Sequence, residues 1–279
     1  MTINQTLNLG TQKLKSASTS ASLDAEVLLS HVLNKPKEHL FANPQQLLSS
    51  KAKKQFFALV KKRVANWPMA YLTNHKGFYG LDFYVDKNVL IPRPVTEDLV
   101  EMVLAKTKKQ NGLSVLDVGT GSGCIIISLA KNSSGKFFAS DISTAALRIA
   151  KKNSRAHKTK VQFKQGDLLA PWKNQSFDII IANLPYLSKR TDPSTKFEPT
   201  KALIAKDSGF ALIEKLFHQI AALPRLPQHV YLEIGHDQGP KVVKSVRSIL
   251  PNYNLKVLKD LPGKVRYAVL NKKPVRRSF

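Results

Sequence analysis

Short apolar runs recur through the last two-thirds of the chain, and segments with helical spacing separate most of them. Seven of these runs have the length and the β-branched or aromatic content of strands. Strands that alternate with helices predict an α/β fold with a mostly parallel sheet, covered by helices on both faces. The runs are SVLDVG, KFFASDI, VQFKQGD, FDIIIANL, HVYLEIG, YNLKVLKDL and RYAVLN.

The first 73 residues have a different pattern, in which apolar residues recur at helical spacing. The segments LDAEVLLSHVL and QFFALVKKRVANW predict helices, and the second is expected to end before Pro68. The earlier stretch TQKLKSASTSAS is polar and is expected to be flexible. The residues predicted to form the apolar faces are Leu23, Val27, Leu28, Leu33, Phe56, Leu59, Val60 and Val64.

A third pattern links these two parts. The stretch FYGLDFYVD alternates and is rich in aromatic residues, which is typical of a hairpin. A Pro-rich turn then leads into a helix that is expected to begin near Thr96. We therefore expect a small helical domain at 1–73, a β-hairpin linker at 74–95 and the α/β domain at 96–279.

Charge is the one anomaly in the composition. The chain of 279 residues is 43% hydrophobic, enough for a sizeable core, but 44 Lys and Arg against 19 Asp and Glu give a net charge of +25. This excess indicates an acidic partner such as RNA, the ribosome or a membrane surface. A host whose proteins are all basic is the alternative. Only short runs such as KAKK, VKKR and NKKPVRRSF cluster, which suits a solvated surface.

Several classes of protein are excluded or disfavoured. A single cysteine, Cys124, excludes an intramolecular disulfide, and the seven histidines lack metal-ligand spacing, so no metal site is expected. The N-terminus lacks the apolar core of a secretory signal. No run approaches the roughly 18 apolar residues of a membrane span. These features predict a soluble, cytoplasmic protein.

The first candidate for chemistry is VLDVGTGSGCIIISLA. An apolar strand ends in Asp117, and the loop Gly119-Thr120-Gly121-Ser122-Gly123 opens a helix. Glycines allow a sharp turn and let a ligand approach the backbone. The spacing is not that of a dinucleotide fingerprint, and no Lys-Ser/Thr pair makes a phosphate loop. The loop therefore suits a ligand without a pyrophosphate.

Two carboxylates at the ends of the next strands extend this site. Asp141 can accept hydrogen bonds from both hydroxyls of a ribose, although a helix cap is an equally good interpretation of Asp141 taken alone. Asp167 can accept from an adenine amino group, with Leu168 beside the ring. Together with the glycine loop they predict a nucleoside site.

The fourth strand runs into NLPY, which predicts a site for an amino group. The side-chain carbonyl of Asn183 and the backbone carbonyl of Leu184 can bind its two hydrogens, and Pro185 keeps Leu184 extended. Tyr186 can pack against the flat face of the group. Such positioning lowers a barrier without a base. An ordinary Asn-Pro turn is the plain alternative.

The order GTGSG, Asp141, GD and N-x-P-Y resembles class I S-adenosylmethionine-dependent methyltransferases, with a Rossmann-like fold, that act on amino nitrogens. More narrowly, the chain is similar to the HemK/PrmC family, which methylates a glutamine of peptide chain release factors. The segments LDAEVLLSHVL, PMAYLTNHKGFYG, LIPRPVTEDLVE, YLEIGHDQG and DLPGKVRYAVL carry this resemblance over nearly the whole chain.

The resemblance implies that S-adenosyl-L-methionine is the cofactor, with its methionine and ribose held by Gly119 to Gly123 and by Asp141. It implies that Asn183 touches both cofactor and substrate, and that Asn183 to Tyr186 bind the amide of the glutamine in a Gly-Gly-Gln loop. The helical domain would dock the release factor, and a monomer is expected. Three positions depart from the family pattern, namely Leu184, Leu168 and Val95.

Other functions stay open at this point. NLPY also occurs in enzymes that methylate adenine amino groups in RNA or DNA, and the positive charge would suit that substrate. A ribosomal-protein glutamine is a second alternative substrate. A non-enzymatic RNA- or ribosome-binding protein that kept the fold is the third alternative.

Overall fold

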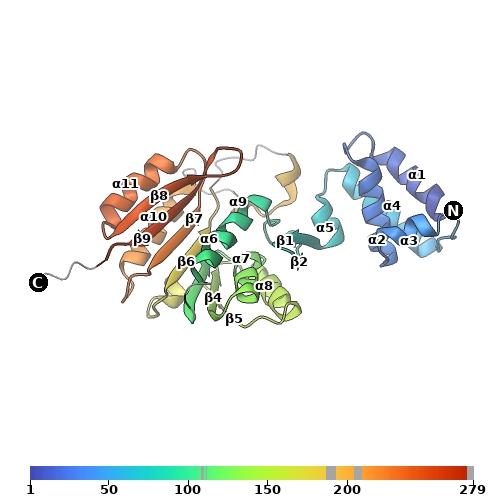
Figure 1. The fold of residues 1–279 in the computed structure, drawn as a ribbon. Helices are drawn as coiled ribbons and strands as arrows, with labels where there is room; N and C mark the ends of the chain where they lie inside the picture. The colour runs from blue at the N-terminus through green and yellow to red at the C-terminus, as the bar shows by residue number, and fades with distance from the viewer. Residues whose placement is uncertain (108–109, 111, 187–192, 204–208, 275–279) are drawn as a thin grey trace, which may run out of the picture. The chain divides into compact units, whose positions relative to one another are not determined.

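The computed structural model describes residues 1–107, 110, 112–186, 193–203 and 209–274, so the end of the basic run NKKPVRRSF lies outside the described residues. The chain divides into two compact units (Figure 1). The first holds Met1–His75 together with the 3-10 helix η3 (Pro193–Phe197), and the second holds the rest.

The described part of the first unit contains α1 (Ile3–Leu14), α2 (Ala21–Leu33), α3 (Lys37–Ala42), α4 (Ser50–Val64) and α5 (Met69–Thr73). The expectation that TQKLKSASTSAS is flexible is wrong for its first part, which lies in α1. A capping box between Thr2 and Gln5 begins that helix. Gly10 then lets α1 approach α4, because a Cβ there would lie 2.5 Å from Cζ of Phe56.

The buried face of α2 is shifted from the predicted one. Leu23 is 47% exposed, whereas Ala25, Leu28 and Leu29 are buried. The shift places Asp24 inside, where its carboxylate accepts a hydrogen bond from Arg63 Nε at 2.7 Å. Hydrophobicity alone predicts the buried face incorrectly, because Ala25 and the ion pair of Asp24 with Arg63 occupy interior positions.

The second unit confirms the predicted sheet of seven strands. In spatial order the strands are β5, β4, β3, β6, β7, β9 and β8, and all adjacent pairs up to β7 are parallel, whereas β9 is antiparallel to both neighbours. The strands are β3 (Leu113–Val118), β4 (Gly135–Asp141), β5 (Val161–Gln165), β6 (Ile179–Asn183), β7 (His229–Glu233), β8 (Tyr253–Lys259) and β9 (Val265–Lys272).

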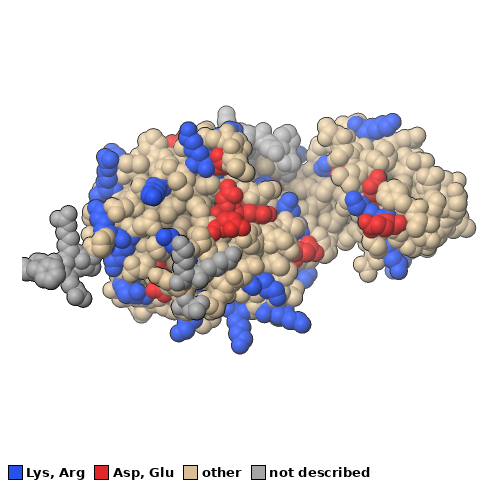
Figure 2. Space-filling model, in the orientation of Figure 1, with Lys and Arg blue, Asp and Glu red and all other residues tan. Residues whose placement is uncertain are grey.

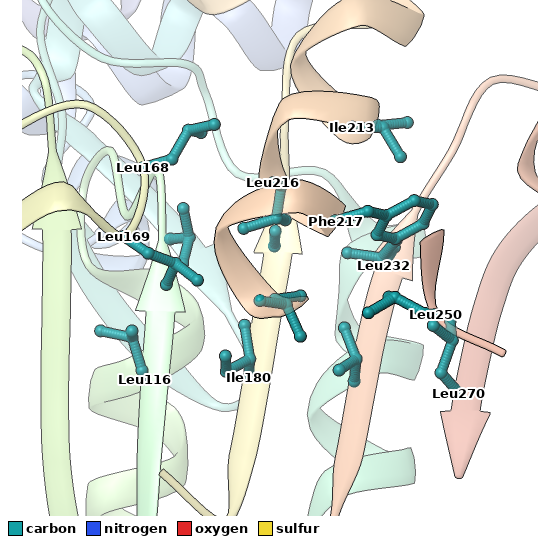
Figure 3. Close-up of a cluster of buried hydrophobic side chains, with 14 of the residues drawn as sticks. Leu116, Leu168, Leu169, Ile180, Ile213, Leu216, Phe217, Leu232, Leu250 and Leu270 are labelled. Atoms are coloured by element: carbon teal, nitrogen blue, oxygen red, sulfur yellow. The ribbon is translucent and has the colours of Figure 1, made fainter. Parts of the chain in front are cut away.

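Helices cover both faces of this sheet, as expected for strands that alternate with helices along the chain. Ile180 of β6 faces the core under α10 (Phe210–Ala221) and α11 (Gly239–Ile249), where Leu216 and Phe217 pack (Figure 3). Its neighbours Ile179 and Ile181 face the core under α6 (Glu97–Thr107) and α7 (Cys124–Asn132). The remaining helices are α8 (Thr144–Ala156), α9 (Thr200–Leu203) and the 3-10 helices η1 (Pro94–Thr96) and η2 (Ala170–Trp172).

The predicted hairpin is also present, as β1 (His75–Phe78) and β2 (Leu81–Tyr84). Phe78 and Phe83 pack into the core under α6. Among the described residues, no helix has the length and apolarity needed to cross a membrane.

The strand order determines where a ligand can bind. From β3 the chain moves outward to β4 and β5, and it then returns to β6 on the other side of β3. The connections on the two sides diverge at this reversal, which leaves a crevice at the carboxyl ends of β3 and β6. GTGSG and NLPY follow these two strands directly.

Candidate active site

A cavity of about 380 Å³ lies at the carboxyl ends of β3, β4 and β6. Loops that follow these strands form one wall, and residues between Lys87 and Thr96, ahead of α6, form another. Ten of the predicted site residues line it: Gly119, Thr120, Gly121, Ser122, Asp141, Asp167, Leu168, Asn183, Leu184 and Pro185.

The glycine loop turns sharply at the end of β3. The amides of Gly119 and Thr120 both donate to the carbonyl of Ser140, at 2.9 and 3.0 Å. Gly119 and Gly121 have φ values of +76° and +56°, a region that side chains disfavour. A Cβ on Gly119 would lie 3.1 Å from Cδ2 of Leu184, so glycine also keeps the loop clear of NLPY.

The carboxylate of Asp141 binds two backbone amides of the neighbouring loops. Its Oδ1 accepts a hydrogen bond from the amide of Ser143 at 2.8 Å, just before α8. Its Oδ2 accepts from the amide of Gly121 at 2.9 Å. These contacts hold the carboxylate rigidly in the cavity wall, where each oxygen keeps a lone pair for a hydroxyl donor. Burial raises the pKa of Asp141, although its backbone hydrogen bonds act in the opposite direction.

Asp117 and Gly123 differ from the other predicted cofactor residues, because neither is among the described residues that line the cavity. Asp117 is 1% exposed, and its Oδ2 accepts a hydrogen bond from Oγ1 of Thr120 at 2.6 Å. Its Oδ1 has no hydrogen-bond partner among the described residues. Asp117 thus supports the glycine loop from behind, and the structure gives it no direct place in the cavity wall.

Burial raises the pKa of Asp117 to about 7, which predicts a pH dependence of stability. The unfolded value is about 4, so between pH 4 and 7 the folded chain binds more protons than the unfolded chain. This carboxyl therefore lowers the free energy of unfolding as pH rises, by up to about 1.4 kcal/mol per pH unit. Asp117→Asn should flatten the profile measured by chemical denaturation at pH 5, 6 and 7. Equal slopes in the two proteins would contradict this assignment.

The loop after β5 has an unusual backbone. Leu168 has a φ of +53°, and its carbonyl accepts a hydrogen bond from Oγ of Ser140 at 2.8 Å, which holds the loop against β4. The side chain of Leu168 is buried and lines the cavity. Asp167 lines the cavity as well and forms an ion pair with Lys215 of α10.

Asn183 ends β6 with its side-chain amide in a network of hydrogen bonds. Its Nδ2 donates to Oε2 of Glu233 at 2.9 Å and to Oγ1 of Thr96 at 3.2 Å. Glu233 ends the neighbouring strand β7 directly opposite Asn183 in the parallel register. Leu184 and Pro185 continue from β6 along the cavity wall.

Tyr186 has a different environment from the predicted one. It is not among the described residues that line the cavity, and its hydroxyl donates to Oε1 of Glu233 at 2.9 Å. The guanidinium of Arg266 lies 5.8 Å from the centre of its ring. The structure therefore gives Tyr186 a place in the network behind Asn183, where the sequence predicts a contact with the substrate.

Two residues of this network carry no clear signal in the sequence. Thr96 belongs to the turn PRPVTE, which precedes a predicted helix and lies outside the motifs predicted to form the site. Glu233 stands near the end of the predicted strand HVYLEIG, where a structural role is as good an interpretation as a place in the active-site wall. Glu198 is buried, and its carboxylate accepts hydrogen bonds from the amide of Ile91 at 3.2 Å and from the guanidinium of Arg93. It thus anchors the segment that forms the second wall.

Comparison with known proteins identifies the family of this chain. The family model described as "PrmC N-terminal domain" matches residues 5–73, and a methyltransferase domain model matches residues 109–245. The release factor glutamine methyltransferase of Koribacter versatilis is 35% identical over 283 residues, which cover 98% of this chain and 99% of the relative. This chain belongs to the release factor glutamine methyltransferase family. The corresponding protein of Leptospira interrogans is 36% identical and covers 91% of this chain and 92% of its own.

Solved structures support the fold of this family member. A ribosomal protein L11 methylase from Lactobacillus delbrueckii has a TM-score of 0.51 and 21% identity, covering 68% of this chain and 84% of its own. A methyltransferase from Pyrococcus furiosus has a TM-score of 0.52 and 20% identity, covering 71% and 92%. The larger unit thus has the class I methyltransferase fold. The chain is an S-adenosylmethionine-dependent methyltransferase.

Proposed function

We propose that this enzyme transfers a methyl group from S-adenosyl-L-methionine to the side-chain amide nitrogen of the glutamine in the Gly-Gly-Gln motif of a peptide chain release factor. The observation that carries the proposal is similarity over 98% of the chain to a release factor glutamine methyltransferase. That match includes both the helical part and the methyltransferase part. Adenine methylation of RNA or DNA is not favoured by these relatives.

The cofactor would bind along the loops after β3, β4 and β5. Support comes from the glycine loop, where a Cβ on Gly119 would crowd Leu184, and from the rigidly held carboxylate of Asp141 in the wall. In the proposal, the loop from Gly119 to Gly123 holds the methionine part and Asp141 accepts from the ribose hydroxyls. Asp167 accepts from the adenine amino group, and Leu168 covers one face of the ring.

When bound, the cofactor supplies a methyl group on a positively charged sulfur. The residues of NLPY would prepare the amide nitrogen that receives it, because the lone pair of an amide is delocalised and reacts poorly. We propose that Oδ1 of Asn183 and the carbonyl of Leu184 each accept one N–H of the glutamine amide. The nitrogen then faces the methyl group for an in-line displacement, and Pro185 keeps the Leu184 carbonyl rigid. As the new N–C bond forms, the S–C bond breaks and one proton of the nitrogen passes to solvent.

A methylation assay with labelled cofactor tests the proposed substrate. The purified enzyme is incubated in parallel with a release factor, with ribosomal RNA and with ribosomal proteins. We expect label in the release factor, and none when its Gly-Gly-Gln glutamine is replaced by alanine. Label that appears only in RNA would support an adenine amino-methyltransferase instead, and label in a ribosomal protein would support that substrate.

The domain roles belong to the same proposal. Residues 1–73 would dock the release factor, residues 74–95 would link the domains, and residues 96–279 would carry out the transfer. The match of the "PrmC N-terminal domain" model to 5–73 supports treating that part as a domain of its own. A monomer that works in the cytoplasm, where release factors act, completes the proposal.

Positive charge on α8 supports a further part of the proposal, proximity to ribosomal RNA. Between Asp141 and Asp167 the chain has no acidic residue. Within that stretch α8 exposes Arg148, Lys151 and Arg155 at helical spacing on one face. Figure 2 shows blue side chains along the lower edge of the unit, where Figure 1 draws α8. A row of cations in a stretch of sequence that has no carboxylate favours a phosphate backbone.

Charge reversal tests this face. The triple variant Arg148→Glu, Lys151→Glu and Arg155→Glu should weaken binding to ribosomes by about 30-fold or more near 0.1 M salt, because phosphate contacts and counterion release are lost. Methylation of the free release factor should stay within about twofold. The matched control reverses Lys256, Lys259 and Lys264, which are exposed on and beyond β8. Equal losses in the two variants would mean that only the net charge matters.

A further inference from the structure

An asparagine side chain can present either its oxygen or its nitrogen to a ligand, since the two ends of the amide have nearly the same shape. The proposed reaction works with only one of these orientations. Oδ1 toward the cavity accepts an N–H of the glutamine amide, whereas Nδ2 in the same place would meet that N–H with another donor. Something must therefore decide which end of Asn183 faces the cavity.

The contacts of Glu233 fix the orientation of the Asn183 amide. This carboxylate is 2% exposed and receives three hydrogen bonds, from Oγ1 of Thr96 at 2.7 Å, Nδ2 of Asn183 at 2.9 Å and the hydroxyl of Tyr186 at 2.9 Å. An ionised carboxylate only accepts hydrogen bonds. The end of Asn183 that faces Glu233 must therefore be the donor, Nδ2.

The hydrogen bonds of Thr96 require the same orientation of the Asn183 amide. Its hydroxyl hydrogen is used in the bond to Glu233, so its oxygen can only accept from Asn183, at 3.2 Å. Both neighbours of the Asn183 amide thus require Nδ2. Reversing the amide would place a carbonyl oxygen against a buried carboxylate and remove the N–H donor that Glu233 and Thr96 share, which is costly.

Surrounding groups favour the ionised form of Glu233, which only accepts hydrogen bonds. Burial raises its pKa, but the hydrogen bonds from Thr96, Tyr186 and Asn183 and the positive charge of Arg266 act in the opposite direction. Nη1 of Arg266 lies 3.4 Å from the hydroxyl of Tyr186, on the far side of the network. Burial also raises the pKa of Tyr186, so its hydroxyl stays protonated and remains a donor.

We propose that Glu233 is a positioning residue for the methyl transfer, which acts by holding the Asn183 amide with Oδ1 directed at the substrate nitrogen. The inference rests on the proposed function, because only an amino-group substrate requires this orientation. It also gives Thr96 and Tyr186 roles as supports of Glu233. The register of β6 and β7 pairs Asn183 with Glu233 and so places the two side chains next to each other.

Two substitutions of similar size separate this role from simple packing. Glu233→Met removes every acceptor, whereas Glu233→Gln keeps an acceptor for Asn183 in one of its two amide orientations. For Glu233→Met we expect kcat to fall about 100-fold, the scale on which a misplaced reacting group slows an enzyme. The KM for release factor and the affinity for S-adenosyl-L-methionine should change less than about threefold, because the rest of the cavity wall is intact. Glu233→Gln should keep kcat within about tenfold of wild type, since its carbonyl can replace the carboxylate toward Asn183.

A double-mutant cycle shows whether Glu233 acts through Asn183. If it does, Glu233→Met adds little further loss when Asn183 is already alanine, so the double variant matches Asn183→Ala alone. Losses that multiply in the double variant would overturn the proposal. Equal kcat for the methionine and glutamine variants would overturn it as well.

A measurement without substrate keeps the inference separate from the proposed function. In ¹⁵N-labelled enzyme, the side-chain NH₂ of Asn183, assigned by its absence in Asn183→Ala, should exchange slowly with solvent, because both acceptors hold it. The same signal should exchange at least about tenfold faster in Glu233→Met, since only Thr96 remains to hold the group. Unchanged exchange would overturn the network. Failure of the wild type to methylate a release factor would count against the proposed substrate only.

Discussion

Replacement of Asn183 by alanine is expected to lower kcat for methyl transfer by about a thousandfold. The variant loses one of the two acceptors proposed to fix the amide nitrogen, and a preorganised polar contact of this kind contributes a factor of about 10² to 10³ in kcat. It also leaves Thr96 and Glu233 without the donor that they share. Single-turnover kinetics with saturating cofactor measures the effect directly.

Asn132 provides a matched control for this substitution. Its side-chain amide donates to the carbonyl of Ser128 at 2.8 Å near the end of α7, away from the cavity wall. Asn132→Ala should therefore change stability slightly and kcat less than about twofold. If Asn183→Ala retained more than about a tenth of wild-type kcat, the acceptor role of Asn183 would be wrong.

Gly209→Ala is expected to have an effect about as large as that of Glu233→Met, although Gly209 is not among the described residues that line the cavity. Gly209 stands just before α10 with a φ of +75°. A Cβ there would lie 2.2 Å from the carbonyl oxygen of Pro185 and 2.6 Å from Cα of Tyr186. Because both atoms belong to the backbone, either the NLPY turn or the backbone before α10 must move, and we expect the NLPY turn to be displaced. A displacement of about 1 Å at such a site lowers kcat/KM by about 100-fold.

Gly263 separates the collision from the strain of a left-handed backbone. It has a φ of +85°, but a Cβ there meets nothing within 4 Å. Gly263→Ala carries the same backbone penalty without the contact, so steady-state kinetics should show kcat/KM within about twofold of wild type. Equal losses in both variants would show that backbone strain causes the effect and that the NLPY turn does not move.

The α/β sheet could be predicted from the sequence because its strands are buried on both faces. Ile179, Ile180 and Ile181 illustrate this, since one apolar run serves two cores. The helices of the first unit were harder to predict. α1 is polar over most of its length, so its capping box and the contact of Gly10 with Phe56 decide its position. Periodicity does not detect either feature.

The candidate site shows the same division. Residues at strand ends, such as Asp141 and Asn183, could be predicted because the carboxyl ends of parallel strands meet at one edge of a sheet. Which polar side chains lie behind that edge, and not in the cavity wall, could not be predicted. Tyr186 and Asp117 have chemically suitable side chains, but hydrogen bonds to Glu233 and Thr120 hold them away from the cavity wall. Contacts between distant segments determine which polar groups face a ligand.

Tandem mass spectrometry of the Gly-Gly-Gln peptide, after a release factor has been incubated with enzyme and S-adenosyl-L-methionine, shows directly whether the glutamine side chain is methylated. Two carbonyl oxygens, from Asn183 and Leu184, are proposed to present a glutamine amide nitrogen for methylation. We expect one added methyl group on that side-chain nitrogen with wild-type enzyme and almost none with Asn183→Ala. An unmodified glutamine, or a methyl group on another residue, would contradict it.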